Sequence, residues 1–178
     1  MKKIIFLFIL FLSFVAQAQF NNQRQQRVSQ QSQVQQKAPK PNFDVKKYLR
    51  IIVYDIEKYA KKSKVKLSSE KGKQFSKILT NYNREIKDIS RINSFTFRET
   101  KNMVESFQKS AMKTGDFSGQ IEVQKKMIEN LKPVAETIKE EDKKLNKAIK
   151  SLLSEKQYKK WIKYNRKKGK FFSIEKEE

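Results

Sequence analysis

Apolar residues recur at helical spacing through most of the chain after its first forty residues. The stretch from Asp44 to Lys62 carries apolar side chains at three- and four-residue steps, which predicts one amphipathic helix. Asp55 lies within that apolar face. We expect it to meet a lysine or a tyrosine hydroxyl, or to sit at the edge of the face, because buried carboxylates need polar partners.

Two longer patterns follow, and they predict the main body of the fold. Both repeat at alternating four- and three-residue steps, which is typical of helices that pack at shallow angles. A glycine between them, Gly115, favours a helix stop, so we expect an antiparallel hairpin. The first pattern, from near Ser69, consists of Phe75, Leu79, Tyr82, Ile86, Ile89, Asn93, Thr96, Thr100, Met103 and Phe107; the second consists of Met127, Leu131, Val134, Ile138, Asp142, Leu145, Ile149 and Leu152.

The predicted fold class is all-α, with a long antiparallel helical hairpin and two shorter flanking helices. Sustained period-two alternation is absent, and the whole chain has only four glycines, which argues against strands and tight turns. Pro133 lies inside the second long pattern. It predicts a kink there, unless the helix restarts at that point.

The first residues are typical of a cleaved secretory signal. Lys2 and Lys3 precede an apolar run from Ile4 to Val15, which is too short for a membrane span. Ala16 and Ala18 then place small residues where signal peptidase cleaves, so we predict a signal peptide over residues 1–18 and a mature chain that begins at Gln19. The predicted location is periplasmic or secreted; an uncleaved amino-terminal anchor is the alternative.

Residues 19–42 have the composition of a linker. Nine of the eighteen residues from Gln19 to Gln36 are glutamine, and Pro39 and Pro41 follow. Such a segment cannot bury enough apolar surface to offset the entropy of ordering it, so we predict a disordered tether. A single helical domain over residues 43–178 remains.

The amino-acid composition excludes most of the common catalytic mechanisms. The chain contains no cysteine and no histidine, which excludes disulfides and nucleophiles activated by histidine. Zinc, copper and nickel sites normally require those same residues. We therefore predict a protein that is not an enzyme, with no catalytic residue, cofactor or metal site.

The formal net charge is +22, and removal of Lys2 and Lys3 with the signal changes it little. This charge attracts anionic partners such as acidic unfolded proteins, lipid head groups and envelope polysaccharide, although it does not choose among them. Nucleic acid fits less well, because the signal directs the protein away from it and the basic residues are scattered along the sequence. The densest basic cluster, from Arg166 to Lys170 beside Phe171 and Phe172, is interpreted as a solvated helix end or else as an anchor for an anionic surface.

Aromatic and basic residues gather off the packing seam of the first long pattern. The group consists of Arg91, Ile92, Phe95, Phe97 and Arg98. Large apolar side chains away from a seam are either covered by another helix or exposed to a partner. We predict these five residues as a contact surface.

A motif near the end of the chain predicts a helix start. Leu153, Ser154 and Gln157 are followed by Tyr158 and Trp161. Ser154 can cap the helix, and Gln157 at the third helical position can complete a capping box. Capping boxes begin many unrelated helices, so the motif alone predicts local structure.

Together with export, helical patterning and lack of cysteine, this box resembles the LTxxQ motif of the Spy/CpxP family of periplasmic proteins. Family members carry the box twice. Leu67 and Ser68, at the start of the first long pattern, resemble the first copy, but Lys71 stands where glutamine is expected. The resemblance covers roughly Val65 to Arg166.

The resemblance implies an ATP-independent chaperone that holds unfolded envelope proteins. It also implies a thin, curved homodimer whose concave face mixes apolar and positively charged side chains. Two other functions fit the residues: a module that binds an anionic envelope polymer or membrane surface through charge, and a structural or adaptor protein with a dedicated partner.

Overall fold

The computed structural model describes residues 40–172, and this part of the chain is all-α. It contains no strand and six helices: α2 (Val45–Tyr48), α3 (Ile56–Ser63), α4 (Glu70–Ile92), α5 (Ser94–Thr114), α6 (Gln120–Leu152) and α7 (Glu155–Lys167). The predicted signal peptide, with Ala16, Ala18 and Gln19, lies outside the described residues, as do residues 19–39 of the predicted linker.

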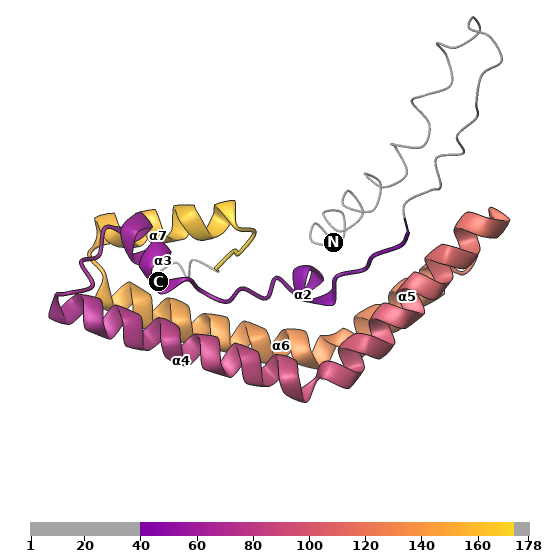
Figure 1. The fold of residues 1–178 in the computed structure, drawn as a ribbon, viewed down its shortest axis with the longest axis horizontal. Coiled ribbons are helices and arrows are strands. Elements are labelled where there is room, and N and C mark those ends of the chain that lie inside the picture. The colour runs from indigo at the N-terminus through magenta and orange to yellow at the C-terminus, as the bar shows by residue number, and fades with distance from the viewer. Residues whose placement is uncertain (1–39, 173–178) are drawn as a thin grey trace, which may run out of the picture. The chain divides into compact units, whose positions relative to one another are not determined.

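The predicted hairpin is confirmed. Helix α6 runs antiparallel to α4 with its second half and to α5 with its first half (Figure 1). Gly115 ends α5 in the left-handed conformation, with φ of 75°, and its amide donates to the Ala111 carbonyl at 2.8 Å. This conformation is the usual role of glycine after a helix.

A break at Asn93 divides the first arm of the hairpin into α4 and α5. The buried positions of α4 are Phe75, Leu79, Tyr82 and Ile86, as the seam predicts. After the break they are Phe97, Thr100, Val104 and Ala111, so two of the predicted seam positions are displaced by one residue. The buried face therefore passes from Ile86 to Phe97 across the break, and the register of the seam shifts by one residue there.

Pro133 does not interrupt α6, which continues through it. Asn130 Nδ2 donates to Thr100 Oγ1 at 3.4 Å, which places Pro133 near the level of the α4–α5 break across the antiparallel pair. A proline cannot donate its backbone N–H and bends a helix. Figure 1 shows α6 following the bend of the other arm, so the helix kinks and does not restart.

The prediction of one helix from Asp44 to Lys62 is wrong. Only α2 and α3 are helical, and residues 49–55 are not. Arg50 adopts a left-handed φ of 54°, and the backbone of Tyr54 bonds to the side chain of Asn83 through both its N–H (2.7 Å) and its C=O (2.8 Å). These distant contacts fix an extended segment that lies against α4.

Asp55 caps α3 and is not part of a buried helical face. Its side chain accepts from the Lys58 amide at 3.0 Å, and the residue is exposed. An aspartate at this position satisfies an amide that has no partner within the helix. Thus the same residue that interrupts the apolar pattern marks the true start of the helix.

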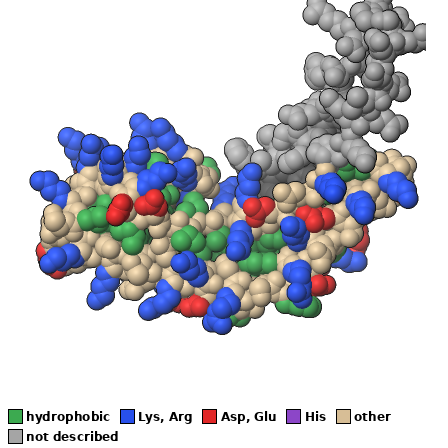
Figure 2. All heavy atoms as spheres, in the orientation of Figure 1, with side chains coloured by type: hydrophobic (Ala, Val, Ile, Leu, Met, Phe, Trp, Pro, Cys, Tyr) green, Lys and Arg blue, Asp and Glu red, His purple; other side chains and the backbone are tan. Residues whose placement is uncertain are grey.

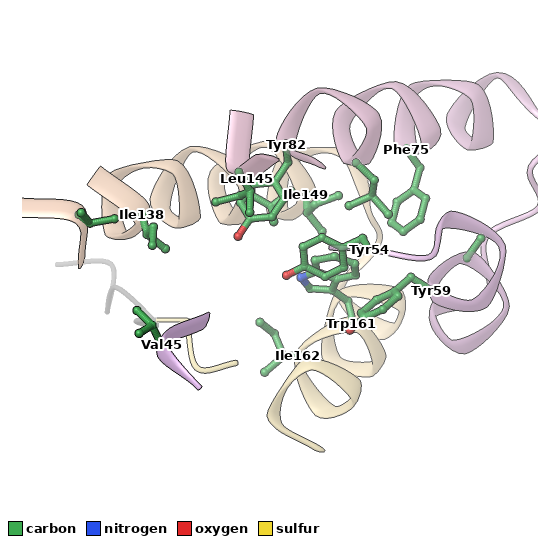
Figure 3. Close-up of a cluster of buried hydrophobic side chains, with 14 of the residues drawn as sticks. Val45, Tyr54, Tyr59, Phe75, Tyr82, Ile138, Leu145, Ile149, Trp161 and Ile162 are labelled. Carbon is green, nitrogen blue, oxygen red and sulfur yellow. The ribbon is translucent and has the colours of Figure 1, made fainter. Parts of the chain in front are cut away.

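Helices α3 and α7 pack together as a lobe beside one end of the hairpin (Figure 1). The core runs continuously from this lobe into the hairpin, and its aromatic part surrounds Trp161 (Figure 3). Trp161 is fully buried, with Tyr54 stacked on it at 5.2 Å between ring centroids, and Phe75 edge-on at 5.8 Å. Phe172 stacks at 6.3 Å, so segments from both ends of the described chain meet at this one ring.

Candidate binding surfaces

The α4–α5 break presents two large apolar side chains to solvent. Ile92 is 73% exposed and Phe95 is 64% exposed. The Arg98 guanidinium lies over the Phe95 ring, 5.4 Å from its centroid, and Arg91 pairs with Asp88 at 3.3 Å. We call Arg91, Ile92, Phe95 and Arg98 the elbow patch. Arg98 also lies 3.9 Å from Glu99, so the elbow patch combines exposed apolar area with two arginines that each have a neighbouring carboxylate.

Phe97 does not belong to the elbow patch. It is only 8% exposed, because two residues along a helix correspond to roughly 200° of rotation and bring Phe97 to the face opposite Phe95. On that inner face α2 lies against α5, and a cavity of about 330 Å³ between them is lined by Phe97, Lys101 and the segment 42–46, with Arg98 of the elbow patch at its edge. The five residues predicted as one contact surface are therefore divided between two faces.

The tip of the hairpin carries a second exposed apolar group, which was not predicted from the sequence. Ile121 is 80% exposed, and Met112, Phe117 and Ile128 are also exposed. These residues flank Gly115, where the chain turns. Their exposure could have been predicted from the sequence, because they lie off the predicted seam and on either side of a helix stop.

The capping box predicted at Ser154 is confirmed. Ser154 Oγ accepts from the Gln157 amide at 3.4 Å, and Gln157 Oε1 accepts from the Ser154 amide at 3.2 Å. Gln157 also does more than cap, since its Nε2 donates to the Lys64 carbonyl at 2.8 Å. One side chain therefore begins α7 and fastens it to the end of α3. Leu153 and Trp161, the apolar members of the motif, are buried.

The first motif copy forms a helix start that is displaced by one residue. Ser69, and not Ser68, caps α4, with its Oγ accepting from the Gly72 amide at 3.1 Å. Leu67 is partly buried against the core, whereas Ser68 is exposed. A Cβ on Gly72 would lie 2.0 Å from the Lys66 carbonyl oxygen, so glycine is required where the loop crosses the helix.

A buried polar cluster joins four segments near the lobe. Lys170 Nζ lies 2.6 Å from Asp142 Oδ2 and 3.2 Å from the Arg50 carbonyl, and Tyr82 donates its hydroxyl to Asp142 Oδ1 at 2.7 Å. Lys170 is 2% exposed, so the interpretation of the basic tail as a wholly solvated end is wrong at this residue. Asp142 meets both a lysine and a tyrosine hydroxyl, as expected for a carboxylate in an apolar seam.

Desolvation dominates the electrostatics of this cluster. Burial raises the pKa of Asp142, although Lys170 and Tyr82 both act to lower it. Burial likewise lowers the pKa of Lys170 against the pull of Asp142, and it raises the pKa of Tyr82. Each group has satisfied hydrogen bonds and lies among core side chains, so its role is structural.

Nearby tyrosines show the same effect of burial. The pKa of Tyr59 rises to about 12 because of burial, with smaller contributions from Tyr164 and Asp55. Tyr54 donates its hydroxyl to Asn165 Oδ1 at 3.0 Å, and Asn165 donates in turn to the Trp161 carbonyl at 3.0 Å. These bonds satisfy the Tyr54 hydroxyl and the Asn165 amide, whereas Trp161 Nε1 is buried without a hydrogen-bond partner among the described residues.

Two further properties of residues 40–172 bear on function. Within this range no three acidic side chains come together in a way that could hold a metal ion. Also within it, no helix has both the length and the apolar character needed to span a bilayer.

Comparison of the chain with protein-family models, with curated proteins and with solved structures found no match. The resemblance to Spy/CpxP proteins therefore rests on the motif residues alone.

Proposed function

We propose that this protein is an exported, non-catalytic binding protein that holds unfolded envelope proteins without ATP. The elbow patch is the observation that supports this most directly. Ile92 and Phe95 leave large apolar surfaces in water on helices whose inner faces are otherwise well packed. Exposed apolar groups of this kind usually serve contact with a partner.

Charge and apolar surface would act at different stages of binding. Long-range attraction brings an acidic unfolded chain to a protein of net charge +22. Apolar contact with Ile92 and Phe95 then holds it, and Arg98 over the Phe95 ring keeps a cation within reach of client carboxylates. Loose contact of this kind suits many clients, because no side chain must fit a defined pocket.

The proposal is tested by light scattering of an aggregating client, without ATP, in the presence of the mature chain. Changing both Ile92→Ser and Phe95→Ser should weaken suppression roughly tenfold, since losing about 1.4 kcal/mol of apolar contact changes affinity by that factor. Phe117→Ser with Ile121→Ser, at the tip, is the matched control because it removes similar exposed apolar surface.

High salt separates this function from binding by charge alone. Exposed charge pairs are screened beyond about 10 Å at 0.1 M salt, whereas apolar contact persists. We expect suppression to retain most of its strength at high salt. Complete loss of suppression in salt, or equal suppression by the elbow variant and the wild type, would contradict the proposal. Capture of one partner in fixed ratio would instead indicate an adaptor.

A further inference from the structure

The lobe formed by α3 and α7 carries a continuous stripe of lysines. On α7, Lys156, Lys160, Lys163 and Lys167 follow steps of four, three and four residues, which places them on one face of the helix. The opposite face, with Trp161, is buried in the core. The stripe runs the length of a helix of about 20 Å.

Helix α3 adds to the same concentration of charge. Lys58, Lys61 and Lys62 share one face at steps of three and one, and all three are exposed. Figure 2 shows Lys and Arg side chains gathered over this lobe. The scatter of basic residues along the sequence thus becomes a cluster once α3 and α7 pack together.

The lobe differs from the hairpin in how its charges are balanced. On the hairpin, cations pair with nearby carboxylates, as in Lys143 with Glu140 at 2.9 Å and Lys126 with Glu122 at 3.5 Å. On the lobe, α3 and α7 together hold nine Lys and Arg against only Glu57 and Glu155. Within residues 40–172, Lys159 with Glu155 is the one ion pair formed inside these two helices.

The chemistry of the stripe suits a broad anionic surface. Eight of the nine cations are lysines, which act as hydrated point charges and not as the planar, bidentate partners that arginine provides. Nucleic-acid binding without sequence preference normally adds several exposed rings for base stacking, but on α7 Trp161 is buried and Tyr158 and Tyr164 are partly buried. Beyond α7 the Phe171 ring is exposed, and the Arg50 guanidinium already lies over it, 5.1 Å from its centroid. The cavity lined by Phe97 lies between α2 and α5, away from the lobe.

We propose that the outer face of α3 and α7 docks on the anionic head groups of a lipid bilayer. Lysines near such a surface each add to the attraction, and the effect falls off within a Debye length. The lobe uses other residues than the elbow patch, so this surface is independent of the proposed polypeptide contacts. Docking through the lobe would leave the hairpin free of contact with the bilayer.

Vesicle sedimentation of the exported protein, purified without its predicted leader, tests the proposal. Vesicles of phosphatidylglycerol mixed with phosphatidylcholine should bind the protein, and pure phosphatidylcholine vesicles should not. The stripe variant carries Lys156→Gln, Lys160→Gln, Lys163→Gln and Lys167→Gln. We expect it to bind roughly a thousandfold more weakly, since four lysines near the surface are lost.

The matched control removes the same charge from the hairpin. It carries Lys125→Gln, Lys132→Gln, Lys139→Gln and Lys147→Gln, all at exposed positions of α6. We expect it to bind within a few-fold of the wild type. Circular dichroism and Trp161 fluorescence establish that both variants are folded.

Three results would overturn the proposal: equal weakening by the two variants, binding to pure phosphatidylcholine as strong as to anionic vesicles, or no binding to anionic vesicles. Soluble polyphosphate at equal total charge serves as the competitor. If the wild type binds polyphosphate more tightly than it binds vesicles of the same total charge, the lobe prefers a soluble polyanion to the lipid surface, which is a fourth result against the proposal.

Discussion

Lys170 is the only lysine of residues 40–172 whose side chain is buried, and its surroundings explain why. It reaches Asp142 on α6 and the carbonyl of Arg50 in the extended segment. A buried ion pair gains little overall, because desolvation offsets the attraction, but removing one partner leaves a costly isolated charge. The pair therefore fixes where the two ends of the domain meet the hairpin.

Asp142→Asn should destabilise the fold by about 3–5 kcal/mol, because Lys170 would stay buried without a counter-ion. Lys170→Met should cost less, about 1–3 kcal/mol, since Asp142 keeps its bond from Tyr82 and is partly exposed. Urea unfolding followed by Trp161 fluorescence measures both. The double variant should cost less than the sum of the single changes. Additive costs would show that the two charges do not interact.

Gln157 shows how one side chain can serve two elements. A glutamate would complete the capping box equally well, since only an acceptor is needed there. The bond to the Lys64 carbonyl, however, needs the amide N–H of glutamine. This double use distinguishes the Gln157 box from an ordinary helix start and gives a physical reason for glutamine in the motif.

Gln157→Glu should therefore destabilise the protein by about 1 kcal/mol, even though a negative charge at the start of a helix is favourable. Gln74→Glu is the control, since Gln74 is exposed on α4, and it should stay within about 0.5 kcal/mol of the wild type. Thermal and urea unfolding measure both. A stabilised Gln157→Glu variant would mean that the tie to Lys64 contributes nothing.

At the scale of helices, periodicity predicted what depends on local sequence. The hairpin, the stop at Gly115 and the start at Ser154 are all confirmed. The extended segment at residues 49–55 was missed, because it depends on Asn83 and Lys170, which lie far away in sequence. Polar residues in the seam mark the region around Asn93 as unusual. They do not predict that the helix breaks there or that the buried positions after it shift by one residue.

The same limit applies to the candidate contact surface. Ile92 and Phe95 are exposed, yet Phe97 turns inward toward α2. The angle between positions 95 and 97 could have been read from the sequence. The α2 segment that lies against α5 could not, because its position depends on a turn at Arg50 and on the bond from the Phe43 amide to Glu105.

In the described domain, the two halves of the hairpin are packed against unequal amounts of the remaining chain. The α4 arm and the second half of α6 pack against α3, α7 and the extended segment, whereas α5 and the first half of α6 have only α2 beside them (Figure 1). Local opening costs less where fewer apolar contacts must be broken. The α5 end should therefore open more readily than the end beside the lobe.

Hydrogen exchange measured by mass spectrometry tests this expectation. Amides of α5 and of the first half of α6 should exchange at least about tenfold faster than those of α4, equivalent to ~1.4 kcal/mol in opening free energy. The exposed ends of each helix serve as internal references for fraying. Uniform protection along α6 would show that the hairpin opens as one cooperative unit.

The position of Trp161 gives the protein a built-in optical reporter. It is the one tryptophan in the chain, and Tyr54 from the extended segment and Phe172 from beyond α7 both stack on it. Detachment of either segment would wet the indole while the long helices stay wound. Fluorescence and far-ultraviolet circular dichroism, recorded on one sample, would thus separate loosening of the lobe from melting of the hairpin without any attached dye.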